Sequence, residues 1–137
     1  MIRRDFLLLT ATVGLALPMA ARAESLDYTP DILKADLAAG KTVVLHFSAT
    51  WCGTCQAQAR VMGDLKSANP AYDKGLTFLN VDWDTYKGGD LTQKLNVPER
   101  STIVVLKGDK EIGRLYSETA PGPIKALIDT ALQAATS

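Results

Sequence analysis

Segments that favour β-strands and segments that favour α-helices alternate along this chain. Thr42 to Ser48 contains the unbroken apolar run Val43-Val44-Leu45, which is typical of a strand buried on both faces of a sheet. From Cys52 to about Ala68 the apolar pattern is helical. The same alternation continues with strand-like residues 76–82, a short helix at 90–95, strand-like residues 102–106 and 111–116, and a last helix from about 123. This order predicts an α/β fold with two parallel crossovers and a terminal antiparallel hairpin.

Two helix starts carry recognisable capping signals. Thr29-Pro30-Asp31 combines an N-cap residue, a first-turn proline and an acid at the positive end of a helix, and Gly40 is expected to end that helix. Asp90 and Gln93 have the spacing of a capping box for the short helix that follows. With 137 residues, the whole pattern fits a single domain.

The first 23 residues have the pattern of an export signal. Arg3-Arg4 precedes an apolar run from Phe6 to Leu17, and Ala21-Arg22-Ala23 offers the small residues that a signal peptidase needs. The run is shorter than the roughly 20 residues that span a bilayer, although an uncleaved anchor is the alternative. Two arginines, one residue and Phe-Leu resemble the twin-arginine signal. We predict a signal peptide over residues 1–23, a domain over residues 24–137, and a periplasmic protein exported by the twin-arginine route.

The charge balance of the predicted mature chain gives no case for nucleic-acid binding. Removing residues 1–23 takes away three of the 15 basic and one of the 15 acidic residues, which leaves 12 and 14 and a net charge near −2. Neither a basic run nor an acidic block is present. A nucleic-acid partner is therefore not expected, and with no exposed apolar stripe in the pattern we expect a monomer.

The two cysteines, Cys52 and Cys55, stand where a predicted buried strand ends and a helix begins. A disulfide between them closes a loop of only four residues, for which the chain-entropy formula gives about 2 kcal/mol, so stability is a poor reason for the pair. Positions i and i+3 share a helix face, and a helix N-terminus stabilises a thiolate. We therefore predict Cys52 as the nucleophile of disulfide exchange and Cys55, one turn inside, as the resolving cysteine.

The segment Trp51-Cys52-Gly53-Thr54-Cys55 resembles the Trp-Cys-Gly-Pro-Cys signature of thioredoxins. The similarity extends over most of the mature chain, because Val43–Phe47, Leu79–Asp82 and Thr102–Asp109 are similar to the family's two core strands and its hairpin. The resemblance implies the thioredoxin fold, a central mixed β-sheet flanked by helices in a single domain, and a thiol–disulfide oxidoreductase. This chemistry requires no cofactor and no metal ligands, and none are predicted.

One departure from the family concerns the group beneath the cysteines. The family has a buried Asp six residues before the first cysteine, where it accepts protons from the second; that position here is His46, the only histidine in the chain. Because imidazole titrates near neutral pH, His46 is predicted to accept the proton of Cys55. The alternative is a core histidine hydrogen-bonded to backbone. The lysine that partners the family's Asp corresponds to Phe78 here.

A second departure concerns the loop that faces the cysteines, where the family carries a cis-proline. Counting back from the Lys107-Gly108 turn places this position at Ser101, whereas counting forward from Asp82 places it at Pro98. We favour Ser101, since the spacing to the hairpin is the less variable of the two. A non-proline cis bond costs about 2.5–4 kcal/mol, so the bond between Arg100 and Ser101 is predicted to be trans.

Three residues are predicted to contact the substrate: Trp51, Arg100 and Ser101. For Trp51 the role is that of a lid on the active site, with simple packing as the alternative. Thr54 replaces the family's proline between the cysteines; its hydroxyl either donates to the Cys52 thiolate or points to solvent.

Three functions remain open from the sequence. The first is a periplasmic oxidoreductase acting on protein thiols and disulfides. We expect a reductant rather than an oxidant, because the chain has no length for the helical insert that periplasmic oxidants of this fold carry. A reductase outside the cytoplasm implies a membrane thiol carrier as its electron source. The second is a soft-metal module that binds or delivers Cu(I) through the same two cysteines. The third is a non-catalytic interaction domain with a static disulfide.

Overall fold

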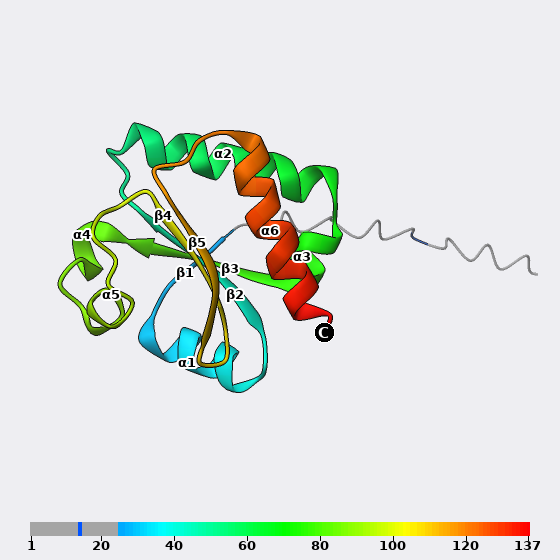
Figure 1. Cartoon of the computed structure of the whole chain (residues 1–137), viewed down its shortest axis with the longest axis horizontal. Helices are drawn as coiled ribbons and strands as arrows, with labels where there is room; N and C mark the ends of the chain where they lie inside the picture. Colours follow the sequence, from blue (N-terminus) through cyan, green and yellow to red (C-terminus); the bar gives the residue numbers. More distant parts are fainter. Residues whose placement is uncertain (1–13, 15–24) are drawn as a thin grey trace, which may run out of the picture.

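The computed structural model describes Gly14 and residues 25–137, so the predicted signal peptide lies, apart from Gly14, outside the described residues. A five-stranded mixed sheet in the order β1-β3-β2-β4-β5 forms the centre of the molecule (Figure 1). The strands are β1 (Leu26–Asp27), β2 (Thr42–Ser48), β3 (Leu76–Asp82), β4 (Thr102–Lys107) and β5 (Lys110–Tyr116). β1, β3 and β2 run parallel, whereas β4 is antiparallel to both β2 and β5.

Helices cover both faces of this sheet. The helices are α1 (Pro30–Ala38), α2 (Gly53–Ala68), α3 (Ala71–Gly75), α4 (Trp83–Tyr86), α5 (Asp90–Lys94) and α6 (Pro121–Ala135). On one face α2, α3 and α6 supply Met62, Tyr72, Ile124 and Ile128 to a buried core. On the other face Leu33 of α1 is buried in a second core, against which residues of α4 and α5 pack. Figure 1 shows α2 and α6 together on one side of the sheet and α1 and α5 on the other.

Alternation along β2 decides which face each of its side chains serves. Val43, Leu45 and Phe47 belong to the core on the α1 side, whereas Val44 belongs to the core under α2 and α6. Because successive side chains of a strand point to opposite faces, His46 shares the face of Val44. The strand thus carries its only imidazole to the layer between the sheet and α2.

Most predicted boundaries are confirmed, but one crossover and one capping box were wrong and three short elements were missed. β2 and β3 span the predicted residues, and α1 has Thr29 as its N-cap, with Gly40 at φ 76° just beyond its end. The two-residue edge strand β1 and the short helices α3 and α4 were not predicted. The predicted parallel crossover from residues 76–82 to residues 102–106 was wrong, because β4 runs antiparallel to β2 and therefore also to β3. The second parallel crossover instead runs from β1 through α1 to β2. The capping box was wrong: Gly89 is the N-cap of α5, and the Gln93 side chain donates to the Gly88 carbonyl instead.

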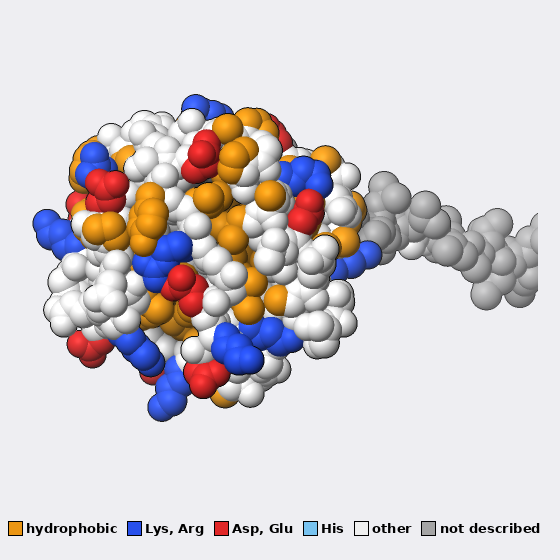
Figure 2. Space-filling view, viewed as in Figure 1, with side chains coloured by type: hydrophobic (Ala, Val, Ile, Leu, Met, Phe, Trp, Pro, Cys, Tyr) orange, Lys and Arg blue, Asp and Glu red, His pale blue; other side chains and the backbone are white. Residues whose placement is uncertain are grey.

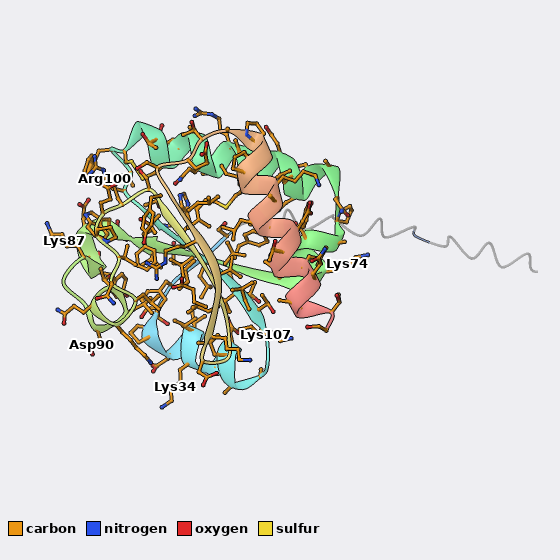
Figure 3. All side chains as sticks on the ribbon, in the orientation of Figure 1. Lys34, Lys74, Lys87, Asp90, Arg100 and Lys107 are labelled. Carbon is orange, nitrogen blue, oxygen red and sulfur yellow. A yellow bond between two sulfur atoms is a disulfide. The ribbon has the colours of Figure 1, made fainter. Side chains whose placement is uncertain are left out.

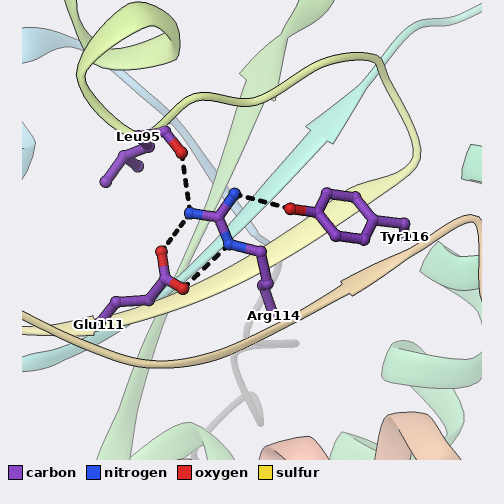
Figure 4. Close-up of polar contacts among 4 residues, drawn as sticks. All are labelled: Leu95, Glu111, Arg114 and Tyr116. Atoms are coloured by element: carbon purple, nitrogen blue, oxygen red, sulfur yellow. Dashed lines mark hydrogen bonds and ion pairs between the residues drawn. The ribbon is translucent and has the colours of Figure 1, made fainter.

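Arg114 on β5 holds the chain segment that leads from α5 towards Ser101 (Figure 4). Its Nη2 donates to the Leu95 carbonyl at 2.8 Å, its Nε donates to Glu111 Oε2 at 2.9 Å, and its Nη1 donates to the Tyr116 hydroxyl at 3.0 Å. The Glu111 carboxylate raises the pKa of Arg114, which therefore stays protonated. These bonds tie the edge of the sheet to the loop whose end faces the cysteines.

The surface carries both signs of charge. On the face seen in Figure 2, Lys and Arg side chains are interspersed with Asp and Glu side chains, with apolar side chains between them. None of the helices described for residues 25–137 combines the length and the apolar character that a membrane-spanning helix needs.

Candidate active site

Cys52 and Cys55 form a disulfide at the N-terminus of α2, with their Cα atoms 5.3 Å apart. Cys52 is the N-cap residue, and its Sγ accepts the backbone N–H of Cys55 at 3.1 Å. The first turn of α2 contains no acidic residue, so no carboxylate there would repel a thiolate at the positive end of the helix. Thr54 is exposed, and the backbone rather than its hydroxyl supplies this hydrogen bond. Both cysteines are buried, with Ala49 beside them and Trp83 packed against the three.

Ser101 faces the two sulfurs from the opposite side, as predicted for the cis-proline position. Its hydroxyl lies 3.2 Å from Cys52 Sγ and 3.1 Å from Cys55 Sγ. The bond before it is trans, like the other peptide bonds of the described residues, and Ser101 has a left-handed backbone with φ 62°. Its N–H donates to the Phe47 carbonyl at 2.8 Å. Pro98, the other possibility, is exposed three residues earlier.

His46 lies in the layer beneath this pair and is 7% exposed. Its Nε2 is 3.0 Å from Oε1 of Gln58, a residue of α2 one turn beyond Cys55. The Gln58 amide nitrogen donates in turn to the Ser101 carbonyl at 3.0 Å. A chain of contacts therefore joins His46 to Ser101, whose hydroxyl touches both sulfurs.

His46 also shares a pocket with Cys55. The pocket has a volume of about 330 Å³, and its polar lining includes Ser48, Asn80 and Asp82 besides His46 and Cys55. Burial lowers the pKa of His46 below 6.5, an effect that the hydrogen bond with Gln58 partly offsets. The imidazole is therefore neutral at neutral pH and has a lone pair available for a proton.

The depressed pKa of His46 predicts a pH dependence of stability. Below pH 6.5 the unfolded chain takes up a proton that folded His46 does not, so the free energy of unfolding should fall as the pH drops, by at most about 1.4 kcal/mol per pH unit. The fall should continue down to the folded pKa of His46 and then cease. Urea unfolding of the wild type and of His46→Gln between pH 7.5 and pH 5 measures it; the difference between the two proteins removes the contribution of the carboxylates. Parallel pH profiles would contradict the prediction.

Trp51 and Arg100 form an exposed pair beside the disulfide. The Trp51 side chain is 59% exposed, so it is not core packing, and its Nε1 donates to Asp84 Oδ2 at 2.9 Å. The Arg100 guanidinium lies 4.4 Å from the centre of the Trp51 ring. Figure 3 shows Arg100 at the end of the molecule where α2 begins, on the opposite side from Lys74 and Lys107. Arg100 Nε is buried and makes no hydrogen bond within the part of the chain that the structure describes.

Two features of the site were not predicted. Gln58 is fully buried, and the signal was present: it lies in helical register with the buried Cys55 and Met62, where an apolar residue is the rule. The second is Lys66 of α2, whose Nζ lies 4.5 Å from the centre of the Phe78 ring. Lys66 thus lies over Phe78, the residue at the position of the family's lysine, but Lys66 belongs to α2 and not to the strand.

Comparisons with known proteins agree with this geometry. The sequence model of the thioredoxin family matches residues 24–130. Thioredoxin-2 of Saccharomyces cerevisiae is 37% identical over 93 residues, which cover 67% of this chain and 83% of that protein. The crystal structure of Trxlp from Edwardsiella tarda is similar with a TM-score of 0.65 and 29% identity, over 77% of this chain and 96% of that one.

Coverage is lower for some relatives. Thioredoxin H4-2 of Oryza sativa is 29% identical over 82 residues, which cover 60% of this chain and 58% of that protein. This chain therefore spans little more than half the length of that relative. The family match over residues 24–130 includes the cysteine pair, Ser101 and the whole sheet, and the sheet is mixed and flanked by helices, as predicted. The chain belongs to the thioredoxin family.

Proposed function

We propose that this chain is a thiol–disulfide oxidoreductase in which Cys52 and Cys55 cycle between dithiol and disulfide. The observation that carries the proposal is the Cys52–Cys55 disulfide at the N-terminus of α2, with the Ser101 hydroxyl in contact with both sulfurs. A bridge this short adds little to stability, and the helix terminus is where a thiolate is stabilised. Membership of the thioredoxin family supports the same chemistry.

In the reductive direction the Cys52 thiolate attacks one sulfur of a substrate disulfide. A bond forms between Cys52 Sγ and that sulfur, and the other substrate sulfur leaves as a thiolate. Cys55 then gives up its proton and attacks Cys52 Sγ. The Cys52–Cys55 bond forms, the bond to the substrate breaks, and two electrons have passed to the substrate. His46, which lines the pocket with Cys55, is the proton acceptor in this scheme.

Trp51, Arg100 and Ser101 are the proposed contacts of the substrate. Trp51 offers an exposed apolar ring beside the disulfide, and Arg100 Nε is a buried donor without a partner within the described residues. Since an unsatisfied buried donor is costly, a shift of the Arg100 side chain that lets Nε donate to a carbonyl oxygen of the substrate backbone would be favourable. These features suit an extended protein segment around a disulfide.

We place this reaction in the periplasm, where the protein acts as a reductant and takes its electrons from a membrane thiol carrier. The signal-like residues 1–23 support export, and a twin-arginine route follows from Arg3-Arg4. In the described residues no helical domain is inserted between the strands, which supports the reducing direction.

The redox potential of the cysteine pair tests the direction, by equilibration of the protein with dithiothreitol or glutathione buffers. A redox potential of about −270 mV, that of thioredoxin, is expected for a reductant. A redox potential of about −120 mV would identify a disulfide donor and contradict the reducing direction. A pair that never equilibrates would contradict the oxidoreductase, and reversible retention of Cu(I) without disulfide exchange would favour a metal-binding module.

A further inference from the structure

Gln58 connects three segments that surround the cysteine pair. It belongs to α2 and is fully buried. Its side chain contacts His46 of β2 at 3.0 Å, the Ser101 carbonyl at 3.0 Å and the Glu118 carbonyl at 3.0 Å. Both polar atoms of the buried Gln58 amide are thus hydrogen-bonded, although Gln58 itself forms and breaks no covalent bond in the proposed reaction.

The chemistry of these partners determines which ring nitrogen of His46 carries a proton. Carbonyl oxygens only accept hydrogen bonds, so the two N–H groups of the Gln58 amide are directed to Ser101 and Glu118. Oε1 is left for His46, and because a carbonyl oxygen cannot donate, Nε2 must be the donor. In the neutral imidazole Nδ1 is then the basic nitrogen.

The pocket beside His46 is also lined by Cys55, so a proton can pass between the two residues through it. Cys55 and His46 both line it, and its volume of about 330 Å³ has room for several water molecules at about 30 Å³ each. Asp82, at the end of β3, lines the same pocket. Asp27 from β1 and Lys66 from α2 line a neighbouring pocket that His46 also borders. Asp82, Asp27 and Lys66 are thus the charged residues that line these two pockets.

We propose that Gln58 is a positioning residue that holds His46 with its proton on Nε2, so that Nδ1 accepts the proton of Cys55. The proposal rests on the oxidoreductase function above. When Cys55 resolves the mixed disulfide, its Sγ–H proton passes to Nδ1, and the imidazole becomes a cation that donates from both nitrogens. The electron pair left on Cys55 Sγ forms the bond to Cys52 Sγ, and the substrate sulfur leaves with the electrons of the broken bond. The imidazolium then returns its proton to solvent through the pocket.

The first test is the tautomer of His46, observed by nitrogen NMR on the full chain labelled in histidine. The only histidine of the sequence is His46, so one pair of ring signals reports it. The wild type is expected to carry its proton on Nε2, and Gln58→Met, similar in length but without an amide, is expected to populate the other tautomer. Gln58→Glu keeps an acceptor for Nε2–H, so it should keep the tautomer and raise the pKa of the ring. A wild type with its proton on Nδ1, or an unchanged tautomer in Gln58→Met, would overturn the proposal.

The second test is the pH profile of the resolving step, followed as release of the second thionitrobenzoate from an aromatic disulfide probe. Positioned general bases contribute about 10²–10⁴-fold, so Gln58→Met should slow resolution at neutral pH by about tenfold or more and shift its profile to higher pH. Gln58→Glu should retain most of the rate. Gln93→Met removes an exposed glutamine of α5 with a single carbonyl partner and is the matched control for the chemical change.

Failure of the two proposals can be told apart. If the wild type exchanges disulfides through Cys52 and Cys55 while Gln58→Met, shown to be folded by urea unfolding, changes neither tautomer nor pH profile, only the role of Gln58 is wrong. If the wild type exchanges no disulfide at any pH, the oxidoreductase function and the role of Gln58 in it both fail.

Discussion

Cys52→Ser is expected to reduce disulfide exchange to the uncatalysed background, whereas Cys55→Ser should stop the reaction one step later. A serine hydroxyl at position 52 does not ionise near neutral pH, so no nucleophile remains at the N-terminus of α2. In Cys55→Ser the first attack still occurs, and the product is a mixed disulfide between Cys52 and the substrate. Reduction of insulin by the dithiothreitol-driven protein, with mass spectrometry of the trapped species, measures both results.

The two variants also test the assignment of roles against each other. Both lack the disulfide, so a loss of stability common to the two affects them alike and the comparison isolates the chemistry. Both cysteines are buried, so position along α2 rather than burial supports the proposed roles: Cys52 is the N-cap residue, whereas Cys55 lies within the first turn. A mixed disulfide on Cys55 in the Cys52→Ser protein, with none on Cys52 in the other, would reverse the assignment. Equal trapping on both would show that the position of Cys52 at the helix N-terminus does not order the steps.

Ser101→Pro is expected to destabilise the oxidised protein by about 3 kcal/mol or more, even though proline is the family's residue at this position. Proline requires φ near −65°, and Ser101 has φ 62°. The substitution also removes the N–H that bonds the Phe47 carbonyl, and leaving a buried acceptor unpaired costs about 1–3 kcal/mol, with a similar cost for the backbone. Urea unfolding of the oxidised wild type and variant measures the loss.

Ser101→Ala is the matched control, because it keeps the backbone and removes only the hydroxyl that touches the two sulfurs. Its expected cost is about 1 kcal/mol. Ser101→Gly also lacks the hydroxyl but accepts the left-handed backbone without strain, so it should be no less stable than the alanine variant. A proline variant as stable as the wild type would show that the loop can adopt another backbone.

Several elements could be predicted from the sequence because their signals are local. β2 contains the unbroken apolar run Val43-Val44-Leu45, β3 is rich in apolar residues, and α1 has its N-cap, proline and glycine within a dozen residues. β1 has no such signal: its two residues are exposed, and they form a strand only because β3 offers a free edge. The capping box at α5 was wrong because Asp90, which has the right spacing, lies inside the helix after Gly89.

The cysteine pair, its place between strand and helix, and the loop position Ser101 were available from sequence spacing, since an i, i+3 pair on a helix is a local geometry. The arrangement around His46 was not, because it depends on residues distant in the chain: Gln58 reaches Ser101 across 43 positions and Glu118 across 60. By itself, then, the sequence determined the fold class and placed the cysteine pair at the start of a helix. Only the tertiary structure decided how the imidazole is held, because the partners of a buried polar group are whichever donors and acceptors packing brings within 3 Å of it.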